Sequence, residues 1–196
     1  RSPSRISAQA AARRPGAPAR RRRISHRLIG LADDRDREQS ATLVDDVRDG
    51  VGLGGAVFPS AAKLVAAHDN PIHTLIINGS ECVPYIGCDS MLMRERPDDV
   101  IRGVALLQHL CGARDVMIAI EDNKPEAIAA MEAAAKKHGD GFQIVTLPTV
   151  YPSGGAKQLI KLLTNIEVPG GQHAPEFGVQ CFNSGTAYSV FRAVDL

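Results

Sequence analysis

The sequence has no tryptophan, and aromatic residues make up only 4% of the 196 residues. This scarcity argues against functions that depend on stacking nucleic-acid bases on aromatic side chains. No apolar run approaches the roughly 20 residues of a transmembrane helix, so we expect no membrane span. The N-terminus also lacks the apolar stretch of a secretory signal, which favours a reducing compartment.

Cysteine and histidine are too scattered to predict a metal centre. The four cysteines are Cys82, Cys88, Cys111 and Cys181, and none forms a C-x-x-C pair. The six histidines show no ligand spacing, and no Ser/His/Asp or Cys/His set stands out. We therefore expect free thiols, and neither a zinc ribbon nor an iron–sulfur motif in this chain.

Charge is balanced overall but divided between two blocks. The net charge is +1, yet residues 1–27 hold nine arginines and no acid, and residues 33–49 hold seven acids against three arginines. We interpret residues 1–39 as a tail without a packed core. A tail that binds nucleic acid or anionic lipid is an alternative. The small net charge argues against nucleic-acid binding for the whole chain, and we predict no nucleic-acid partner.

From residue 40 onward the pattern predicts one α/β domain, residues 40–196. Helices are expected over 40–48, 59–67, 97–110, 125–138 and 155–163, with a last short helix near 186–194. Strands are expected over 73–78, 115–121 and 142–147, and residues 164–185 are expected to be irregular. Alternating strands and helices predict a parallel sheet covered by helices. Ligands of such sheets bind beyond the strand carboxyl ends, so the loops 79–89 and 148–155 are the candidate site.

Two glycine-rich segments offer backbone N–H groups without bulky side chains. Residues 50–56 (GVGLGGA) match G-x-G-x-x-G, but acidic residues precede them instead of a buried strand, so the dinucleotide fingerprint lacks its context. Lys63 follows on the next helix, where it reaches a phosphate or lies in solvent. Residues 151–158 (YPSGGAKQ) form a second glycine turn that enters a helix, whose free N–H groups attract anions.

Polar turns follow two other predicted elements. Residues 78–81 (NGSE) end the first strand, and residues 183–186 (NSGT) open the last helix. Residues 78–81 indicate either a capped turn or a set of groups that bind the edge of a heterocycle. In the latter, Asn183 or Thr186 is a candidate helix cap.

Four ordered blocks carry a family resemblance. They are GLGGAVFPSAAKL (52–64), LIINGSECVPYIGCD with MLMRE (75–89 and 91–95), YPSGGAKQL (151–159) and NSGTAY (183–188). These residues resemble the C subunit of the Rnf ion-translocating electron-transport complex over residues 50–194. The core is similar to the NADH-binding flavoprotein subunit of respiratory complex I, which implies a Rossmann-like fold of that type.

The resemblance implies a domain that binds FMN and exchanges a hydride with NADH, as part of an NADH-dependent oxidoreductase. Carried over by position, the catalytic candidate is Glu81, near the nicotinamide, and Phe58 would stack with the nicotinamide nucleotide. The residues implied to contact FMN are Gly52, Gly54, Gly55, Lys63, Asn78, Ser80, Gly154, Gly155, Asn183 and Thr186.

The resemblance also implies further modules, partner subunits and a cellular location. In the complete subunit, a β-rich module and a ferredoxin-like module with 4Fe–4S iron–sulfur clusters would follow this chain. The implied partners are the other Rnf subunits and a ferredoxin-type electron partner, at the cytoplasmic face of the bacterial inner membrane. Electron transfer between NADH and ferredoxin would be coupled to ion translocation, and attachment of this part would be peripheral.

Three departures from the family pattern keep alternatives open. Val83 stands where the pattern usually has a glutamate, and Ala156 where the complex I relative and some Rnf members have another; Ser80 replaces the aspartate of the complex I pattern. Two carboxylates near the nucleotide are missing, which bears on NADH affinity more than on FMN binding. One alternative is therefore a non-catalytic remnant or assembly module of the same fold. Another is a related soluble flavoprotein reductase subunit.

Overall fold

The computed structural model describes residues 52–53, 59–81, 85–139 and 141–195. The basic tail 1–39 and the predicted helix 40–48 lie outside these residues. In the described part of the chain, no helix is long and apolar enough to cross a membrane.

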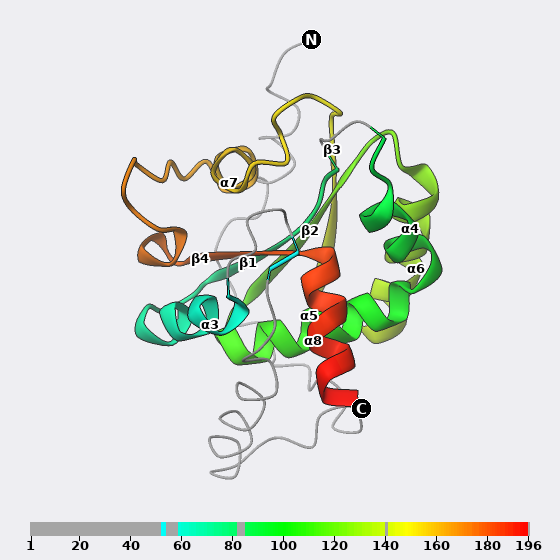
Figure 1. Ribbon diagram of the computed structural model, residues 1–196. Helices are drawn as coiled ribbons and strands as arrows, with labels where there is room; N and C mark the ends of the chain where they lie inside the picture. Colours follow the sequence, from blue (N-terminus) through cyan, green and yellow to red (C-terminus); the bar gives the residue numbers. More distant parts are fainter. Residues whose placement is uncertain (1–51, 54–58, 82–84, 140, 196) are drawn as a thin grey trace, which may run out of the picture.

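A parallel sheet forms the centre of the domain, as the alternating pattern predicts (Figure 1). Its strands are β1 (Thr74–Gly79), β2 (Asp115–Glu121), β3 (Phe142–Leu147) and β4 (Val179–Asn183). The order is β3-β2-β1-β4, and every neighbouring pair is parallel. All four carboxyl ends therefore lie at one edge of the sheet, and β1 lies between β2 and β4.

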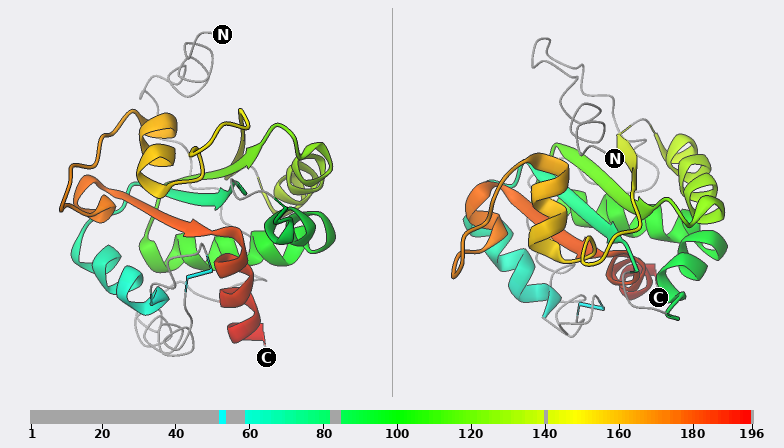
Figure 2. Two further views of the ribbon diagram at one scale, coloured as in Figure 1. Left: turned by 45° about the horizontal axis from the view of Figure 1, so that its top comes forward. Right: turned by 90° about the horizontal axis from the view of Figure 1, so that it is seen from above.

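Helices cover both faces of this sheet (Figure 2). They are α3 (Ser60–Asp69), α4 (Cys88–Glu95), α5 (Pro97–Cys111), α6 (Pro125–His138), α7 (Ala156–Thr164) and α8 (Ser184–Asp195), with a 3-10 turn, η1, at Ala174–Phe177. Pro97 and Pro125 occupy first helical positions, where a missing N–H removes no hydrogen bond. Gly112 ends α5 in the left-handed conformation.

Two elements depart from the sequence-based expectation. Strand β4 forms within the segment 164–185, which the pattern predicts to be irregular, and α4 begins inside the predicted loop 79–89. Both are short, and neither has the length or periodicity that marks the longer elements. The last helix begins at Ser184, two residues earlier than predicted.

The two faces of the sheet are packed by different apolar clusters. Leu75, Ile77 and Ile118 point into the larger one, with residues of α3, α4, α5, α6 and α8. Ile76 and Ala119 point into the smaller one, under α7. Because side chains alternate along a strand, each residue's face follows from its position.

The closest helix packing joins α5 to α8. Gly103 lies against the backbone of Ala187, and a Cβ atom at this position would overlap the Ala187 carbonyl group. Val100, Ile101 and Leu107 are completely buried along the same helix. The lack of a side chain at Gly103 is therefore what allows the two helices to approach.

Candidate functional site

The end of β1 and the loop after β3 meet at the carboxyl edge of the sheet. The amide nitrogen Nδ2 of Asn78 donates a hydrogen bond to the carbonyl of Gly154 over 2.8 Å. The Asn78 carbonyl Oδ1 accepts the N–H of Ser80 over 2.9 Å. Asn78 thus fixes both the turn that follows its own strand and the second glycine turn.

Asn183 and Thr186 form the start of α8, on the other side of β1. The Oδ1 atom of Asn183 accepts the backbone N–H groups of Gly185 (2.8 Å) and Thr186 (3.4 Å), so Asn183 caps this helix, as one of the two alternatives predicted. The hydroxyl of Thr186 instead accepts the N–H of Leu53 over 3.0 Å. This bond attaches Leu53, one of the two described residues of the first glycine segment, to the start of α8.

Glu81, the predicted catalytic residue, is held by the N-terminus of α4. Its two carboxylate oxygens accept the backbone N–H groups of Asp89 (2.7 Å) and Ser90 (3.2 Å), and its side chain is only 2% exposed. Lys124 Nζ lies 3.9 Å from Oε2 of Glu81. Since the helix supplies no side-chain cap of its own, Glu81 takes that place.

Asp89 links α4 to the last strand and helix. It accepts hydrogen bonds from Nδ2 of Asn183 (2.7 Å) and from the hydroxyl of Ser184 (2.8 Å). Burial raises the pKa of the Asp89 carboxyl, and these two hydrogen bonds oppose that effect. Glu81 and Asp89 together connect the ends of β1, α4 and β4 into one hydrogen-bonded frame.

The ligating atoms of Glu81, Cys88 and Asp89 lie within 4.8 Å of one another. The carboxylate oxygens of this group already accept the hydrogen bonds described above, so we assign them to the frame. Burial, reinforced by Asp89 and Glu81, raises the pKa of the Cys88 thiol, which keeps it protonated and weakly nucleophilic.

The predicted free thiols are confirmed for Cys88, Cys111 and Cys181. Burial raises the pKa of Cys111 to about 12 and that of Cys181 to about 11. Both are therefore inert packing residues. Cys82 lies outside the described residues.

Lys63 lies along β4 and not at the end of the strand. Its ammonium group donates to the carbonyl of Cys181 over 3.0 Å and lies 5.1 Å from the centre of the Phe182 ring. These contacts hold the lysine within the protein, contrary to the interpretation that it lies in solvent.

Three polar side-chain atoms near the carboxyl edge have no hydrogen-bond partner within the described part of the chain. They are the hydroxyls of Ser80 and Ser153 and Oε2 of Glu121. Ser80 is 8% exposed and Glu121 only 1%. Burial raises the pKa of the Glu121 carboxyl, and the N–H of Glu81, which donates to that carboxyl, opposes the shift. Buried polar groups are nearly always paired, so this cluster requires an explanation.

Glu121 was not among the residues predicted for the site. It ends a strand that reads DVMIAIE, where a terminal polar residue is ordinarily exposed. The signal that would have found it is the register, because Gly79 pairs with Ile120 and the next residues of both strands are therefore neighbours.

Four of the residues that the resemblance singles out have no described position. Gly54, Gly55, Phe58 and Val83 lie outside the described residues. Gly52 is described and half-buried, next to Leu53, while Gly155 precedes α7 and Ala156 is the first residue of that helix.

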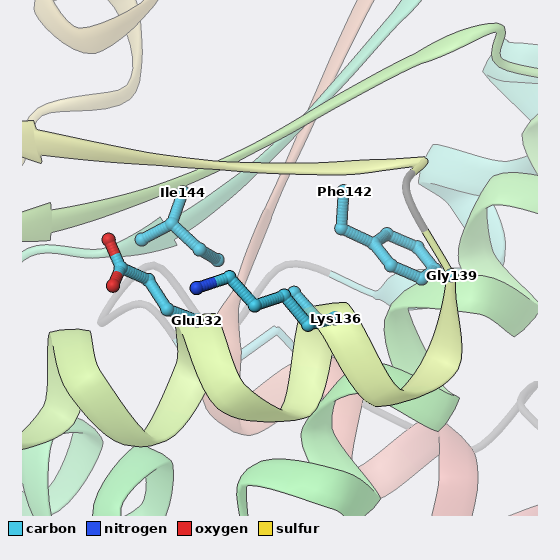
Figure 3. A pocket seen from close by; sticks show the side chains of 6 residues that line it. Glu132, Lys136, Gly139, Phe142 and Ile144 are labelled. Atoms are coloured by element: carbon cyan, nitrogen blue, oxygen red, sulfur yellow. The ribbon is translucent and has the colours of Figure 1, made fainter.

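A pocket lies away from this edge, between α6 and β3 (Figure 3). Phe142 and Ile144 point from β3 toward α6, where Glu132 and Lys136 lie one turn apart. None of the predicted site residues lines it. We therefore keep the carboxyl edge as the candidate site.

Comparison with known families identifies this arrangement. Residues 49–192 match the family described as the Nuo51 FMN-binding domain. The chain belongs to this family. The match spans the glycine segments, the sheet and most of α8, so the elements that form the carboxyl edge are those of an FMN-binding domain.

Curated relatives show similarity to one particular subunit. The two relatives described here are named as the C subunit of the ion-translocating oxidoreductase complex. The chain is 52% identical over 143 residues (73% of its length) to that of Haemophilus influenzae strain PittEE. It is 51% identical over 164 residues (83%) to that of Yersinia pseudotuberculosis serotype O:3 strain YPIII. These matches cover 22% and 23% of the relatives, so the chain spans about a fifth of their length. The resemblance inferred from the four blocks is confirmed.

Solved structures support the fold. Two crystal structures of an NAD+-reducing NiFe-hydrogenase, in the H2-reduced and air-oxidised states, match 82% and 87% of this chain. The TM-scores are 0.66 and 0.69, at 24% and 22% identity, and the matches cover 31% and 32% of those chains. The predicted complex I-like architecture is therefore confirmed.

The described residues also fit a flavin nucleotide. FMN presents hydroxyl groups, ring N–H and carbonyl groups and a phosphate, and the edge offers unpaired polar atoms at Ser80, Glu121 and Ser153. No side chain of the described residues caps the N-terminus of α7, so its first N–H groups are available to an anion.

Proposed function

We propose that the carboxyl edge of this sheet holds FMN and a nicotinamide nucleotide, and that the chain is the hydride-transferring part of an electron-transport complex subunit. One observation carries the proposal: Asn78 near the end of β1, Asn183 at the end of β4 and Gly154 in the loop after β3 converge on an edge where buried polar atoms lack partners in the described structure. The family match supports FMN as the cofactor, and this convergence supports the carboxyl edge as its site.

The contacts suggest distinct tasks for the residues. The side-chain amides of Asn78 and Asn183 donate hydrogen bonds to other groups of the protein. We therefore assign these two residues to holding the edge in shape and not to binding the ligand. Ser80, Glu121 and Ser153 keep hydrogen-bonding capacity for a ligand. Glu81 acts as a positioning residue through its two bonds to α4. We carry Gly52, Gly54, Gly55, Phe58, Lys63, Gly155 and Thr186 forward as cofactor-site residues on the strength of the resemblance.

Bound FMN would supply hydride acceptance from NADH and one-electron transfer onward, which the side chains of this domain do not provide. The protein's part is to hold the two nucleotides against each other and to exclude water from the buried side of the edge. Val83 and Ala156 remove two carboxylates that the family pattern places near the nucleotide. We therefore expect firm flavin binding and weaker NADH binding.

We extend the proposal to the whole protein by likeness to the C subunit of the Rnf complex. The complete protein would carry iron–sulfur clusters and exchange electrons with a ferredoxin-type partner. It would associate peripherally with the other subunits of the complex at the cytoplasmic face of the bacterial inner membrane, where electron transfer drives ion translocation. This extension draws on relatives of which the chain spans about a fifth.

The test is flavin binding by the purified 196-residue chain. We expect FMN fluorescence to be quenched on binding, and absorbance near roughly 450 nm to fall when NADH is added without oxygen. Asn78→Ala removes the bond to Gly154 and should weaken FMN binding about tenfold or more. Gln143→Ala, an exposed amide on β3 away from the edge, is the matched control and should leave binding unchanged.

Each result has a distinct meaning. Binding with bleaching supports a complete hydride-transfer site, and binding without bleaching limits the site to the flavin. A folded chain that binds no FMN would contradict the proposal and favour an assembly module of the same fold.

A further inference from the structure

Glu121 combines features that rarely occur together in a structural residue. It is 1% exposed, it carries a carboxyl group, and its Oε2 atom has no partner among the described residues. An unpaired polar atom that is removed from water costs folding free energy.

The charged groups around Glu121 do not relieve this cost. Glu81 and Asp122 raise the pKa of the Glu121 carboxyl, and Lys124 lowers it. Lys124, however, directs its ammonium group toward Glu81 Oε2, at 3.9 Å. The hydrogen bond that reaches the Glu121 carboxyl is that from the N–H of Glu81, and within the described residues Oε2 remains without a partner.

The strand pattern places Glu121 on the face that bears the candidate site. Ile76 and Ala119 lie two residues before Asn78 and Glu121, and both belong to the cluster under α7. Alternation along the strands puts Asn78 and Glu121 on that same face. Ser80, also unpaired in the described structure, follows the Gly79–Ile120 pair and lies beside Glu121.

The chemistry of these atoms selects the kind of group that they bind. A carboxylate oxygen accepts hydrogen bonds, and a serine hydroxyl both donates and accepts. A phosphate would be repelled by the buried acid, whereas neighbouring hydroxyl groups of a sugar chain would satisfy both residues. Such a chain occurs in two ligands of the proposed site, as the ribityl group of a flavin and as the ribose of a nicotinamide nucleotide.

We propose that Glu121 and Ser80 together bind the hydroxyl groups of a nucleotide's sugar chain, at a subsite on the α7 face of the carboxyl edge. This assignment rests on the proposed function. It adds Glu121 as a specificity-determining residue, since a site built around sugar hydroxyls rejects an analogue that lacks them.

The test compares ligands with and without the sugar chain. The variants are Glu121→Gln, which keeps the shape of the side chain, and Ser80→Ala. The control is Glu132→Gln, an exposed glutamate on α6. Affinities of the purified 196-residue chain are measured for lumiflavin, which has no ribityl hydroxyls, for FMN, and for NADH added to the FMN-loaded chain.

If the ribityl group is the ligand, Glu121→Gln weakens FMN binding about tenfold and leaves lumiflavin binding unchanged, and Ser80→Ala has the same pattern with a smaller factor. If the ribose is the ligand, FMN affinity is retained and NADH affinity falls about tenfold. Either result supports the subsite.

The assignment is overturned if both variants bind FMN and NADH as the unmodified chain does, or if lumiflavin binding falls as much as FMN binding. Failure of the unmodified, folded chain to bind any flavin would overturn the proposed function instead, and the subsite with it. Should Glu121→Gln fail to fold, Ser80→Ala decides between these outcomes, because it removes a single hydroxyl.

Discussion

The contact between α5 and α8 is built mainly from apolar side chains and leaves one polar atom of α5, Nε of Arg102, without a partner in the described structure, whereas the carboxyl edge of the sheet leaves three such atoms. At the helix contact, Gly103 meets the Ala187 backbone and the surrounding apolar side chains are fully buried. At the edge, Ser80, Glu121 and Ser153 keep polar atoms without partners in the described structure. The first region holds the fold together, whereas the second gives up folding free energy that a ligand can recover.

Within the carboxyl edge, too, some polar groups are paired inside the protein and others are not. Asn78, Asp89 and Asn183 form a hydrogen-bonded frame in which each side chain has partners in the protein. Of the unpaired groups, Glu121 and Ser80 lie beside that frame, where strand alternation places them on the face under α7. A rigid frame holding unsatisfied groups is the arrangement expected of a preorganised binding site.

The largest expected effect is at the helix contact. Gly103→Ala places a Cβ atom against the Ala187 backbone, which cannot move aside without separating α5 from α8. We expect a loss of about 3 kcal/mol in the free energy of unfolding, measured by urea denaturation. Gly141→Ala is the control, because a Cβ atom there meets nothing within 4 Å. Equal stabilities of the two variants would show that the two helices are free to separate at this point.

The frame should be less sensitive than the helix contact. Asp89→Ala removes the acceptor of the buried Ser184 hydroxyl and leaves the Asn183 amide only its longer bond, to the carbonyl of Asn78. We expect a loss of about 2 kcal/mol in unfolding free energy together with weaker FMN binding. Asp115→Ala, at an exposed position at the start of β2, should change neither. A stable Asp89→Ala variant would show that the frame does not depend on this carboxylate.

The smallest effect is a dependence of stability on pH at the unpaired groups. The folded-state pKa of Glu121 is raised, chiefly by burial, so the folded chain holds this proton more tightly than the unfolded chain does. The contribution of Glu121 to stability is therefore fully present below its ordinary pKa and is lost as pH rises through the raised value. Glu121→Gln should remove this dependence.

Thermal unfolding of both chains between about pH 4 and pH 8, without flavin, measures the difference. We expect Glu121→Gln to be the more stable chain at the upper end of this range and to lose that advantage toward the lower end. We expect this gain in unfolding free energy to be smaller than the losses predicted for Gly103→Ala and Asp89→Ala. A variant that is less stable at the upper end would mean that the carboxylate is stabilised within the fold, as the groups of the frame are.

Periodicity predicts the long elements of this fold because their signals are local. The β2 stretch DVMIAIE and the helix that begins at Pro97 carry their apolar pattern and their boundaries within themselves. Strand β4 has only five residues between glycine-rich stretches, and its identity depends on pairing with β1. Helix α4 is stabilised at its N-terminus by Glu81, several residues upstream, which no local capping rule predicts.

The candidate site, too, was predicted only where the signal is local in the sequence. The residues at glycine turns and strand ends were predicted because parallel sheets bind ligands at their carboxyl edge. Glu121 was not, since its significance arises from burial beside Ser80, a residue 41 positions away in the chain. Catalytic and cofactor roles came from the resemblance and not from these rules.

The hydrogen bond from the Leu53 N–H to the Thr186 hydroxyl has a consequence for how the domain is made. Its two residues are 133 positions apart, so a growing chain presents the first glycine segment long before its anchor on α8 exists. During synthesis this hydrogen bond cannot form until nearly the whole domain has left the ribosome. If FMN binds at this edge as proposed, the hydrogen bond between Leu53 and Thr186 forms late in synthesis, and a product that ends before Thr186 lacks it.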